Sequence, residues 1–441
     1  MPATDPRPAT THRTTDTDRE QVTAMERSGA VPPPQHGGET PGTASGYHVE
    51  VLPGVDSLPR SVWTDLAPAD DPMWSRDLFT AMERGSIGPD GYACLVVRRG
   101  PDVAAVLPLV LFRELRLDHI VGARERRFLT PVRRLFPRLL RVPTLLCGNL
   151  LGQGHVLTAS PLRDDVSRLL VGAVLDFARR ERLGTVVFKD FTDRDLAPLH
   201  TALRHFGFFR VPSMPDTELR LERGSFEDYL AALPAKPRRN ARSKIRKFEA
   251  LPGLRTEVVH DFSHLLPEML TLYRQVMDRA DQTLDVLDAP FFAAVHESTT
   301  LDRRLVACFE GERLVAFLLC FFAGSGAVGA RIGLDYRLAH DARLYHTVHY
   351  AAIRLALAEG CHHIRFAQTA YEPKTELGCE LIEQAYAVTH LSPLPRAVLR
   401  RLLPPALAAA TARALGSHAP VRGAEGSPRS HDDGRPPHAT R

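Results

Sequence analysis

The stretch Ile332–Cys379 decides the fold and reads IGLDYRLAHDARLYHTVHYAAIRLALAEGCHHIRFAQTAYEPKTELGC. Residues 344–359 place apolar or small side chains at helical spacing on one face, and Gly360 is a typical residue to end that helix. Residues 363–366 return as a short strand, and residues 369–379 are predicted to form a polar loop. A helix between two strands is a crossover unit, so these polar residues are expected at the carboxyl end of the second strand, where open α/β sheets bind ligands.

Length and composition indicate a globular protein with two domains or two copies of one domain. The chain has 441 residues, of which 44% are hydrophobic and 24% are charged. A net charge of +4 is too small to make the whole molecule a polyelectrolyte, so any attraction for anions must come from local clusters. The six cysteines form no C-x-x-C pair, which argues against a zinc or redox motif and favours a reducing, cytoplasmic location.

Both ends of the chain are predicted to be disordered. Residues 1–46 are rich in Thr, Pro and Gly and have no apolar stretch, which excludes a secretory signal, and residues 416–441 have a similar character. Residues 314–330 carry no acidic or basic side chain and approach the length of a membrane span. Their Gly-Ser-Gly centre, however, favours two strands joined by a turn. We therefore expect no stable membrane insertion.

Two segments look like one hairpin used twice. Residues 95–106 and residues 305–316 each read as two apolar strands joined by a glycine-containing turn. A strand, a helix and a strand follow each of these segments. The predicted fold class is therefore α/β, with two tandem domains that are each a mixed sheet flanked by helices. From the N-terminus, the expected organisation is domain 1 over 47–215, domain 2 over 216–395 as the catalytic half, and a C-terminal helix over 396–415.

The order of these elements resembles the GNAT acyltransferase superfamily and, more narrowly, its tandem FemAB-like and CelD-type members, a group that includes peptidoglycan biosynthesis proteins. The resemblance covers roughly residues 47–395. Its motifs are the basic opening of the second half and a spaced pattern in the crossover unit: residues 233–242, Leu344-Tyr345, Ile353, Ala356, Glu359-Gly360, residues 364–366, Lys374 and Gly378.

The resemblance implies an acyl donor but leaves two donors open. Residues 335–343 stand where most GNAT enzymes have a Gly-rich loop for the coenzyme A pyrophosphate, and Ala367 stands where the group often has Gly. Fem-like ligases lack that loop and use aminoacyl-tRNA, but the long coil with which they support tRNA binding is not evident here. The donor is therefore either acyl-CoA or aminoacyl-tRNA, and no metal is expected.

Tyr371 and Asp335 are the predicted catalytic residues. GNAT enzymes often place a tyrosine after the last crossover strand to protonate the leaving group, and the first half of the chain has no tyrosine there. Asp335 ends a strand and is a candidate to meet the acceptor amine. Each residue also has a purely structural alternative, since a tyrosine can pack against a sheet edge and an aspartate can close a turn.

Further polar residues in the same unit are candidates for substrate binding. Their side chains offer hydrogen bonds or a charge near the carboxyl ends of the strands: Lys374, Gln368, Thr369, Tyr336, Tyr345 and His346. His346 and His349 are three residues apart on a helix, but two histidines alone make a poor metal site.

The clearest local charge is a basic helix expected to begin near Pro237. Its cations surround a narrow apolar stripe, and those expected to contact donor phosphates or RNA are Lys236, Arg238, Arg239, Arg242 and Arg246. The arginine-rich segment 124–141 is a candidate to add to this surface. A solvated helix face without a ligand is the structural alternative.

The leading hypothesis is an N-acyltransferase that acts on an amine of a small molecule or a cell-wall precursor, with tRNA as a candidate partner. The alternative is a non-catalytic module that binds RNA or another anionic ligand through the basic helix. The sequence does not determine the acceptor, the acyl group or the oligomeric state.

Overall fold

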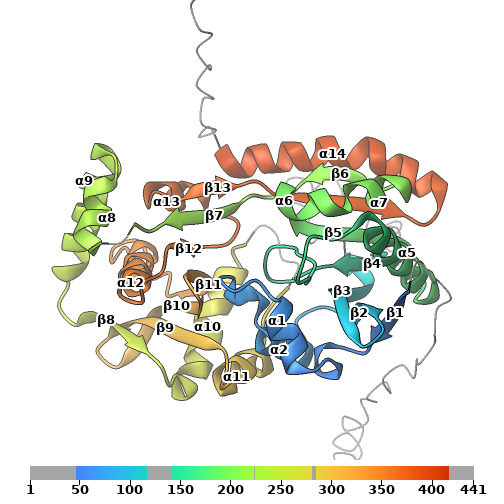
Figure 1. Ribbon diagram of the computed structural model, residues 1–441. Helices are drawn as coiled ribbons and strands as arrows, with labels where there is room; N and C mark the ends of the chain where they lie inside the picture. The colour runs from blue at the N-terminus through green and yellow to red at the C-terminus, as the bar shows by residue number, and fades with distance from the viewer. Residues whose placement is uncertain (1–45, 117–140, 223, 281–284, 417–441) are drawn as a thin grey trace, which may run out of the picture. The chain divides into compact units, whose positions relative to one another are not determined.

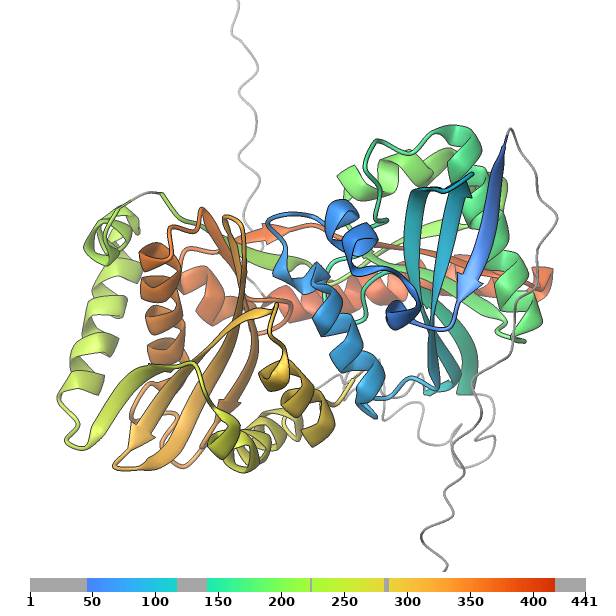
Figure 2. The ribbon, with the colours of Figure 1, turned by 60° about the horizontal axis from the view of Figure 1, so that its bottom comes forward.

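The computed structural model describes residues 46–116, 141–222, 224–280 and 285–416. The predicted disorder of residues 1–46 and 416–441 and the arginine-rich segment 124–141 fall outside these ranges almost entirely, and only Gly46, Gly416 and Arg141 belong to the described part. Figure 1 labels the helices and strands, and Figure 2 shows the same ribbon from a second side.

The first sheet has seven strands in the order β1-β2-β3-β4-β5-β14-β6. Only β4 and β5 pair in parallel, and all the other neighbours are antiparallel. The bounds of these strands are β1 (Tyr47–Leu52), β2 (Gly91–Arg99), β3 (Asp102–Arg116), β4 (Arg141–Cys147), β5 (Thr185–Phe191), β14 (Ala385–His390) and β6 (Phe209–Pro212).

The second sheet repeats this order, read from its other edge as β8-β9-β10-β11-β12-β7-β13. Its single parallel pair, β11 with β12, stands in the place of β4 with β5. The bounds are β8 (Leu254–Val259), β9 (Asp302–Glu310), β10 (Arg313–Ala323), β11 (Gly326–Leu334), β12 (His363–Arg365), β7 (Asp216–Arg220) and β13 (Glu380–Ile382).

The repeat predicted from the two hairpins is confirmed. Gly100 and Gly311 each open a two-residue turn, and each has a φ of 59°, which glycine adopts without strain. The predicted fold class, two mixed sheets flanked by helices, is also confirmed.

Each sheet takes its sixth strand from the other repeat, where one repeat contains β1–β7 and the other contains β8–β14. β14 follows β13 in sequence but lies between β5 and β6, whereas β7 follows β6 but lies between β12 and β13. β14 therefore belongs to the first sheet although its residues fall within the range predicted for domain 2. The boundaries 47–215 and 216–395 stay a prediction.

Helices flank both sheets. The α-helices are α1 (Arg60–Leu66), α2 (Arg76–Arg84), α5 (Asp164–Arg180), α6 (Asp193–Leu196), α7 (His200–His205), α8 (Phe226–Ala232), α9 (Ala235–Glu249), α10 (Leu266–Met277), α11 (Ala289–Glu297), α12 (Leu344–Ala358), α13 (Tyr371–Glu376) and α14 (Pro393–Leu415). Four short 3-10 turns are η1 (Val55–Ser57), η2 (Pro72–Trp74), η4 (Ala197–Leu199) and η5 (Ser263–Leu265).

The alternation of side chains along β10 explains how two layers of helices cover the second sheet. Phe317 and Phe321 are buried in one cluster with Leu272 of α10, whereas Leu318 is buried in another with Val348 of α12. Successive strand residues point to opposite faces, so an unbroken apolar strand requires cover on both sides. Figure 2 shows α12 on one face of this sheet.

The structure decides two predictions about single segments. The apolar stretch 314–330 forms β10 and β11, as predicted, and no helix in the described part of the chain is long and apolar enough to cross a membrane. The prediction of a polar loop over 369–379 is wrong, because α13 forms within it. Pro373 lies at the third helical position, where its missing N–H removes no intrahelical bond.

Candidate functional site

The site is built around the place where β11 separates from β12. The two strands pair in parallel only through residues 326–328 of β11, although β11 continues to Leu334. From Gly329 onward β10 is the only described strand that pairs with β11. We call the side of residues 329–334 that faces away from β10 the β11 edge.

The β11 edge also carries a bulge. Leu319 of β10 lies opposite Arg331 and Cys320 lies opposite Gly329, so Ala330 is an extra residue without a partner. A bulge bends its strand and re-aims the backbone groups around it, and bulges are frequent next to active sites. Backbone N–H groups at such an edge are the type of donor that stabilises the oxyanion formed during acyl transfer.

A row of rings leads from this edge to the start of α12. A β-carbon on Gly329 would meet the Phe366 ring at 2.8 Å, so this glycine allows the ring to lie against the strand. The His349 ring lies 4.8 Å from that of Phe366 and is stacked 4.2 Å from that of Tyr345. The His349 Nδ1–H donates to the Tyr345 carbonyl at 2.7 Å, which leaves a lone pair on Nε2.

The row ends at a charged group that ties α12 to the basic helix α9. The Lys244 ammonium donates to His346 Nε2 at 2.8 Å and also pairs with the Glu376 carboxylate of α13. Burial, with the Lys244 charge beside the ring, lowers the pKa of His346 to about 4. The ring is therefore neutral at pH 7, and α9 is held beside the first turn of α12.

The other cations of α9 are exposed, except Arg238, which is half-buried. Ala241 and Phe248 are buried and Ile245 is half-buried, which confirms the predicted apolar stripe. Arg242 reaches Glu227 at 3.7 Å, and Arg238 donates to the Ala231 carbonyl. The exposed cations without an ion-pair partner among the described residues are Lys236, Arg239, Arg246 and Lys247.

The segment after β12 has an unusual backbone. Ala367, Thr369 and Ala370 have φ values of 58°, 67° and 48°, although none of them is glycine. Each such conformation costs about 1 kcal/mol or more, and strain of this kind is concentrated at functional sites.

Lys374 holds this strained segment from α13. Its ammonium is buried and donates to the carbonyls of Ala367 and Gln368 at 2.9 and 3.0 Å. Burial lowers the pKa of Lys374 to about 8. A buried lysine with a shifted pKa beside strained backbone marks a candidate functional site.

The comparison with protein families agrees with this location. Residues 235–375 match the family model described as Acetyltransferase (GNAT) domain, and this range includes α9, the β11 edge and Lys374. The second half of the chain carries a GNAT acetyltransferase domain. The same match shows that the protein is a transferase at the level of this family.

One solved structure shares the fold of most of the chain, and a second is similar at a lower score. A structure of FemX has 11% sequence identity and a TM-score of 0.51, and the match covers 80% of this chain and all of FemX (100%). A tandem GNAT protein from the clavulanic acid biosynthesis pathway has 14% identity and a TM-score of 0.45, with 78% and 99% of the two chains covered. A search of curated protein sequences found no match.

Tyr371 of the GNAT domain is buried, and its hydroxyl donates to the Pro215 carbonyl at 2.9 Å. Burial raises the pKa of Tyr371, so the phenol keeps its proton. To protonate a leaving group it would have to give up the bond to Pro215. The catalytic role of Tyr371 stays a prediction.

Asp335 is buried between two arginines. Its carboxylate pairs with Arg337 and Arg313, in each case at 2.7 Å. The bonds from Arg337 and Arg313 hold the pKa of Asp335 well below its usual range, despite the opposing effect of burial. This placement disfavours proton abstraction and gives Asp335 a role in fixing the turn before α12; its catalytic role also stays a prediction.

The other predicted binding residues are divided between the ring row and the strained segment. Tyr345 and His346 lie in the row, and Tyr336 is exposed beneath the Arg279 guanidinium at 4.1 Å. Gln368 donates to the Met214 carbonyl and to Gln384, and Thr369 is exposed. No group of three or more potential metal ligands occurs in the described part of the chain.

The first half closes the corresponding place with its own chain. Gly154, in the loop after β4, forms a parallel bridge with Phe191 of β5, and its N–H donates to the Asp190 carbonyl. A β-carbon on Gly154 would lie 2.2 Å from the Lys189 carbonyl oxygen, so only glycine fits. The helix after β4 begins with Asp164 and Asp165, whose charges oppose an anion there.

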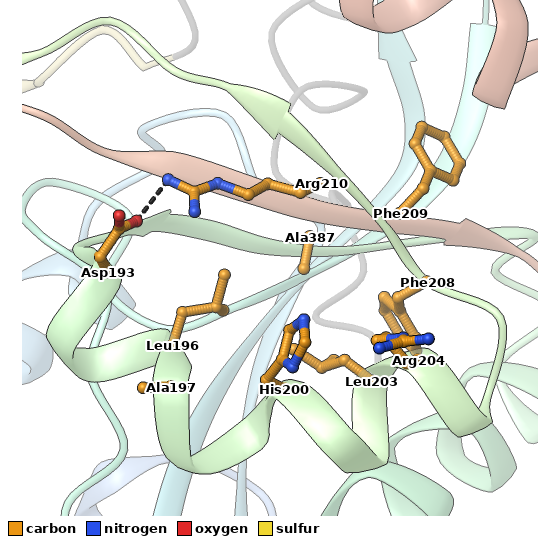
Figure 3. A pocket seen from close by; sticks show the side chains of 10 residues that line it. All are labelled: Asp193, Leu196, Ala197, His200, Leu203, Arg204, Phe208, Phe209, Arg210 and Ala387. Atoms are coloured by element: carbon orange, nitrogen blue, oxygen red, sulfur yellow. Dashed lines mark hydrogen bonds and ion pairs between the residues drawn. The ribbon is translucent and has the colours of Figure 1, made fainter.

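Two hollows also open beside the first sheet, and neither is lined by a predicted site residue. The hollow in Figure 3 has a volume of about 370 Å³ and lies between α6, α7 and the strands β6 and β14, with the Arg210–Asp193 ion pair at one side. A second hollow, of about 480 Å³, is lined by residues of α5 and α14.

Three residues of the site are not among the predicted site residues. Lys244 is one of several cations of the basic helix, and His349 is considered only as a metal ligand. Arg365, which is buried and pairs with Asp71 and Asp216, is only part of the strand predicted over 363–366. His349 shares a helix face with Tyr345, so the i, i+4 spacing was the available signal. No local signal indicated the partners of Lys244 or Arg365, which come from distant segments.

The burial of His349 predicts how the free energy of unfolding depends on pH. Burial lowers the pKa of His349 to about 3, whereas an unfolded histidine titrates near 6.5. As the pH falls below 6.5 the unfolded chain therefore binds the proton first, and the free energy of unfolding decreases until about pH 3. We expect His349→Phe to reduce the loss between pH 7 and pH 4.5 by roughly 2 kcal/mol in urea titrations. The exposed His340→Gln is the control, and an unchanged loss in His349→Phe would contradict the assignment.

Proposed function

We propose that the protein is an N-acyltransferase whose reaction takes place at the β11 edge of the GNAT domain. The observation that carries this proposal is that β11 separates from β12 after Val328 and bulges at Ala330. This arrangement offers backbone N–H groups to an acyl carbonyl, and positioned donors of this kind are effective in acyl transfer. The equivalent place in the first half is filled by its own loop, which supports the second half as the catalytic one.

The donor in this proposal carries phosphates that lie along α9. Arg239, Arg246 and Lys247 are exposed, and Lys244 fixes α9 beside the first turn of α12 through His346. The ring row then leads from this helix to the β11 edge. Acyl-CoA and aminoacyl-tRNA both join phosphates to an acyl group, so both remain donor candidates.

The proposed acceptor is an amine of a small molecule or a cell-wall precursor. Tyr371 is the proposed donor of a proton to the leaving group. Asp335 is the proposed contact of the acceptor amine, and its two arginine partners disfavour proton abstraction by its carboxylate. Lys374, Gln368 and Thr369 shape the segment after β12, and Tyr336 lies on the turn before α12. All six cysteines are unpaired and buried, which supports a reducing, cytoplasmic setting.

The test is an acyl-transfer assay with two donors. The protein is incubated with acetyl-CoA or with a pool of aminoacyl-tRNAs and a panel of amines, and thiol release or deacylation is followed. We expect turnover with one donor and a decrease in kcat of about 100-fold for Tyr371→Phe, as for loss of a general acid.

Tyr229→Phe is the matched control. The Tyr229 hydroxyl also donates to a carbonyl in the same half, that of Leu377 at 2.8 Å, so both variants lose a similar hydrogen bond. If both variants keep kcat within about twofold, the only role left to the Tyr371 hydroxyl is its bond to Pro215.

The alternative is a non-catalytic module that binds RNA or another anion through α9. It predicts binding without turnover for every donor and amine. Its affinity would fall steeply with salt, and replacing Arg239 and Arg246 with Gln would reduce the salt dependence by about one unit of slope for each charge. Turnover that is lost on changes at the β11 edge excludes this alternative.

A further inference from the structure

The second sheet has another face at the β11 edge, opposite the ring row, and an arginine lies on it. The rings pack with α12, whereas Ala330 is buried in the cluster that contains Leu272 and Tyr273 of α10. Arg331 also points to the α10 side, because its Nη2 donates at 3.2 Å to Asp285, in the segment before α11. The proposed donor lies along the ring row, so the acceptor reaches the edge from the α10 face.

The ion pair of Arg331 and Asp285 is open to a small ligand. The two side chains are 16% and 20% exposed, so solutes in the surrounding water can reach both. Among the described residues, Arg331 donates only to Asp285 and, through Nη1 at 2.8 Å, to the Ala330 carbonyl. A guanidinium has five N–H donors in a planar fork that matches a carboxylate. Arg331 therefore keeps N–H groups for a second anion.

Two tyrosine hydroxyls of the same face are incompletely paired. The Tyr273 hydroxyl accepts the Leu287 N–H at 3.2 Å, but no described group accepts its proton. The Tyr92 hydroxyl, from β2 of the first half, is buried and has no hydrogen-bond partner in the described part of the chain. A buried polar group without a partner destabilises the folded protein, so each such group requires an explanation. A polar ligand between the two halves provides one.

The charges that act on these hydroxyls differ in sign. Burial raises the pKa of Tyr92, and the carboxylates of Glu83 and Asp285 raise it further. Burial also raises the pKa of Tyr273, but there the Arg331 charge opposes the effect. The face is therefore positive at Arg331 and negative around Asp285 and Tyr92. This arrangement suits a ligand that carries one charge of each sign.

We propose that Arg331 and Asp285 bind the acceptor, and that this acceptor is an amino acid. The inference rests on the proposed function and names the class of its acceptor. The acceptor carboxylate takes the place of Asp285 on the Arg331 guanidinium and accepts the proton of the Tyr273 hydroxyl, while the acceptor ammonium binds Asp285. One ion pair is exchanged for two, so no charge of the half-buried site is left unpaired.

The bound ammonium loses one proton to solvent before the transfer. Its nitrogen then forms a C–N bond with the acyl carbon as the C–S or C–O bond to the leaving group breaks. The leaving sulfur or oxygen keeps the electron pair of that bond, and the second nitrogen proton is balanced by the proton that the leaving group gains.

Calorimetric titration of the full chain without a donor tests the inference apart from turnover. The standard amino acids are titrated in turn, and the one that binds best is compared with its carboxamide and with the amine that lacks its carboxylate. We expect the amino acid to bind about tenfold or more tightly than either analogue, because both analogues lose a charged hydrogen bond to Arg331.

Two single variants should change this preference in different ways. Arg331→Gln is expected to weaken the amino acid about tenfold or more and to strengthen the matched amine, because Asp285 then has no cation of its own. Asp285→Asn is expected to weaken the matched amine, whose charged contact is Asp285. A pair with a structural role alone predicts a loss of stability and no change of preference.

Two further variants separate binding from folding. Arg331→Gln with Asp285→Asn leaves no unpaired charge, so this double variant should unfold at the urea concentration of the wild type and still lack the preference for the amino acid. Arg304→Gln is the matched control, since Arg304 lies on β9 of the same sheet, is 18% exposed and pairs with Asp302. It should bind all three probes as the wild type does.

Three results would overturn the proposal. Equal affinity of the wild type for the amino acid, the carboxamide and the amine would show that no carboxylate is recognised. A preference that survives in the double variant would place the carboxylate elsewhere, and no binding of any standard amino acid would leave Arg331 and Asp285 as a structural pair. The expected preference without turnover for either donor would instead contradict the proposed function and leave an amino-acid site.

Discussion

Replacing Arg365 with Met is expected to lower the free energy of unfolding by about 3–5 kcal/mol, the usual effect of removing one partner from a buried ion pair. Arg365 is 4% exposed and pairs with Asp71 and with Asp216, the latter at 3.6 Å. Asp71 precedes η2 in the first half, whereas Arg365 ends β12. The change therefore leaves two carboxylates without their shared cation, and urea unfolding measures the loss.

A variant without these charges distinguishes the stability lost with the ion pairs from the stability lost with the packing of the Arg365 side chain. Arg365→Met combined with Asp71→Asn and Asp216→Asn should recover most of the lost stability, because no buried charge remains unpaired. If the triple variant is as unstable as Arg365→Met, the loss comes from packing. A loss below about 1 kcal/mol in Arg365→Met would show that water reaches these carboxylates.

Replacing Lys374 with Met is expected to lower kcat/KM by about 100-fold, since displacement of a site by about 1 Å has effects of this size. The Lys374 ammonium is the group that holds the carbonyls of Ala367 and Gln368, and without it the strained backbone after β12 can relax. Thr217 still donates to the Ala367 carbonyl at 2.7 Å, so the segment stays attached at one point. We expect Lys374→Met to lower the free energy of unfolding by about 1–3 kcal/mol, so the activity is measured per folded molecule.

Lys189→Met is the matched change in the first half. Lys189 is a buried lysine near the end of β5, the counterpart of β12, and it pairs with Asp190, which has a φ of 56°. This change should also destabilise the protein, but it should leave kcat/KM within about twofold if the second half holds the chemistry. The reverse outcome, a rate loss with Lys189→Met and not with Lys374→Met, would move the reaction to the first half.

Local patterns were sufficient to predict most elements of the fold. The two hairpins, the helix over residues 344–359 and the apolar stripe of the basic helix follow from spacing within about twenty residues. The exchange of β7 and β14 was not predictable, because a short apolar strand carries no signal of which sheet it joins. α13 was missed because proline, glutamate and lysine in Tyr371–Glu376 are typical of loops as well as of a first helical turn.

The site was only partly predictable for a related reason. Residue type and position after a strand pointed to Tyr371 and Lys374, and the structure finds Lys374 at the strained segment. The partners that determine what each group can do come from distant segments: Pro215 for Tyr371, and Arg313 for Asp335. The chemistry of a polar side chain depends on its surroundings, and sequence spacing does not give them.

The crossing of β7 and β14 between the sheets has a consequence for how this duplicated gene can change. A truncated product that contains only β1–β7 lacks β14, which is the sixth strand of its sheet. It retains β7, which pairs only in the sheet of the missing half. Neither half can therefore be discarded or transferred alone, including the first half, whose loop after β4 closes the place that corresponds to the β11 edge. Selection on either half is then enough to preserve the other as its scaffold.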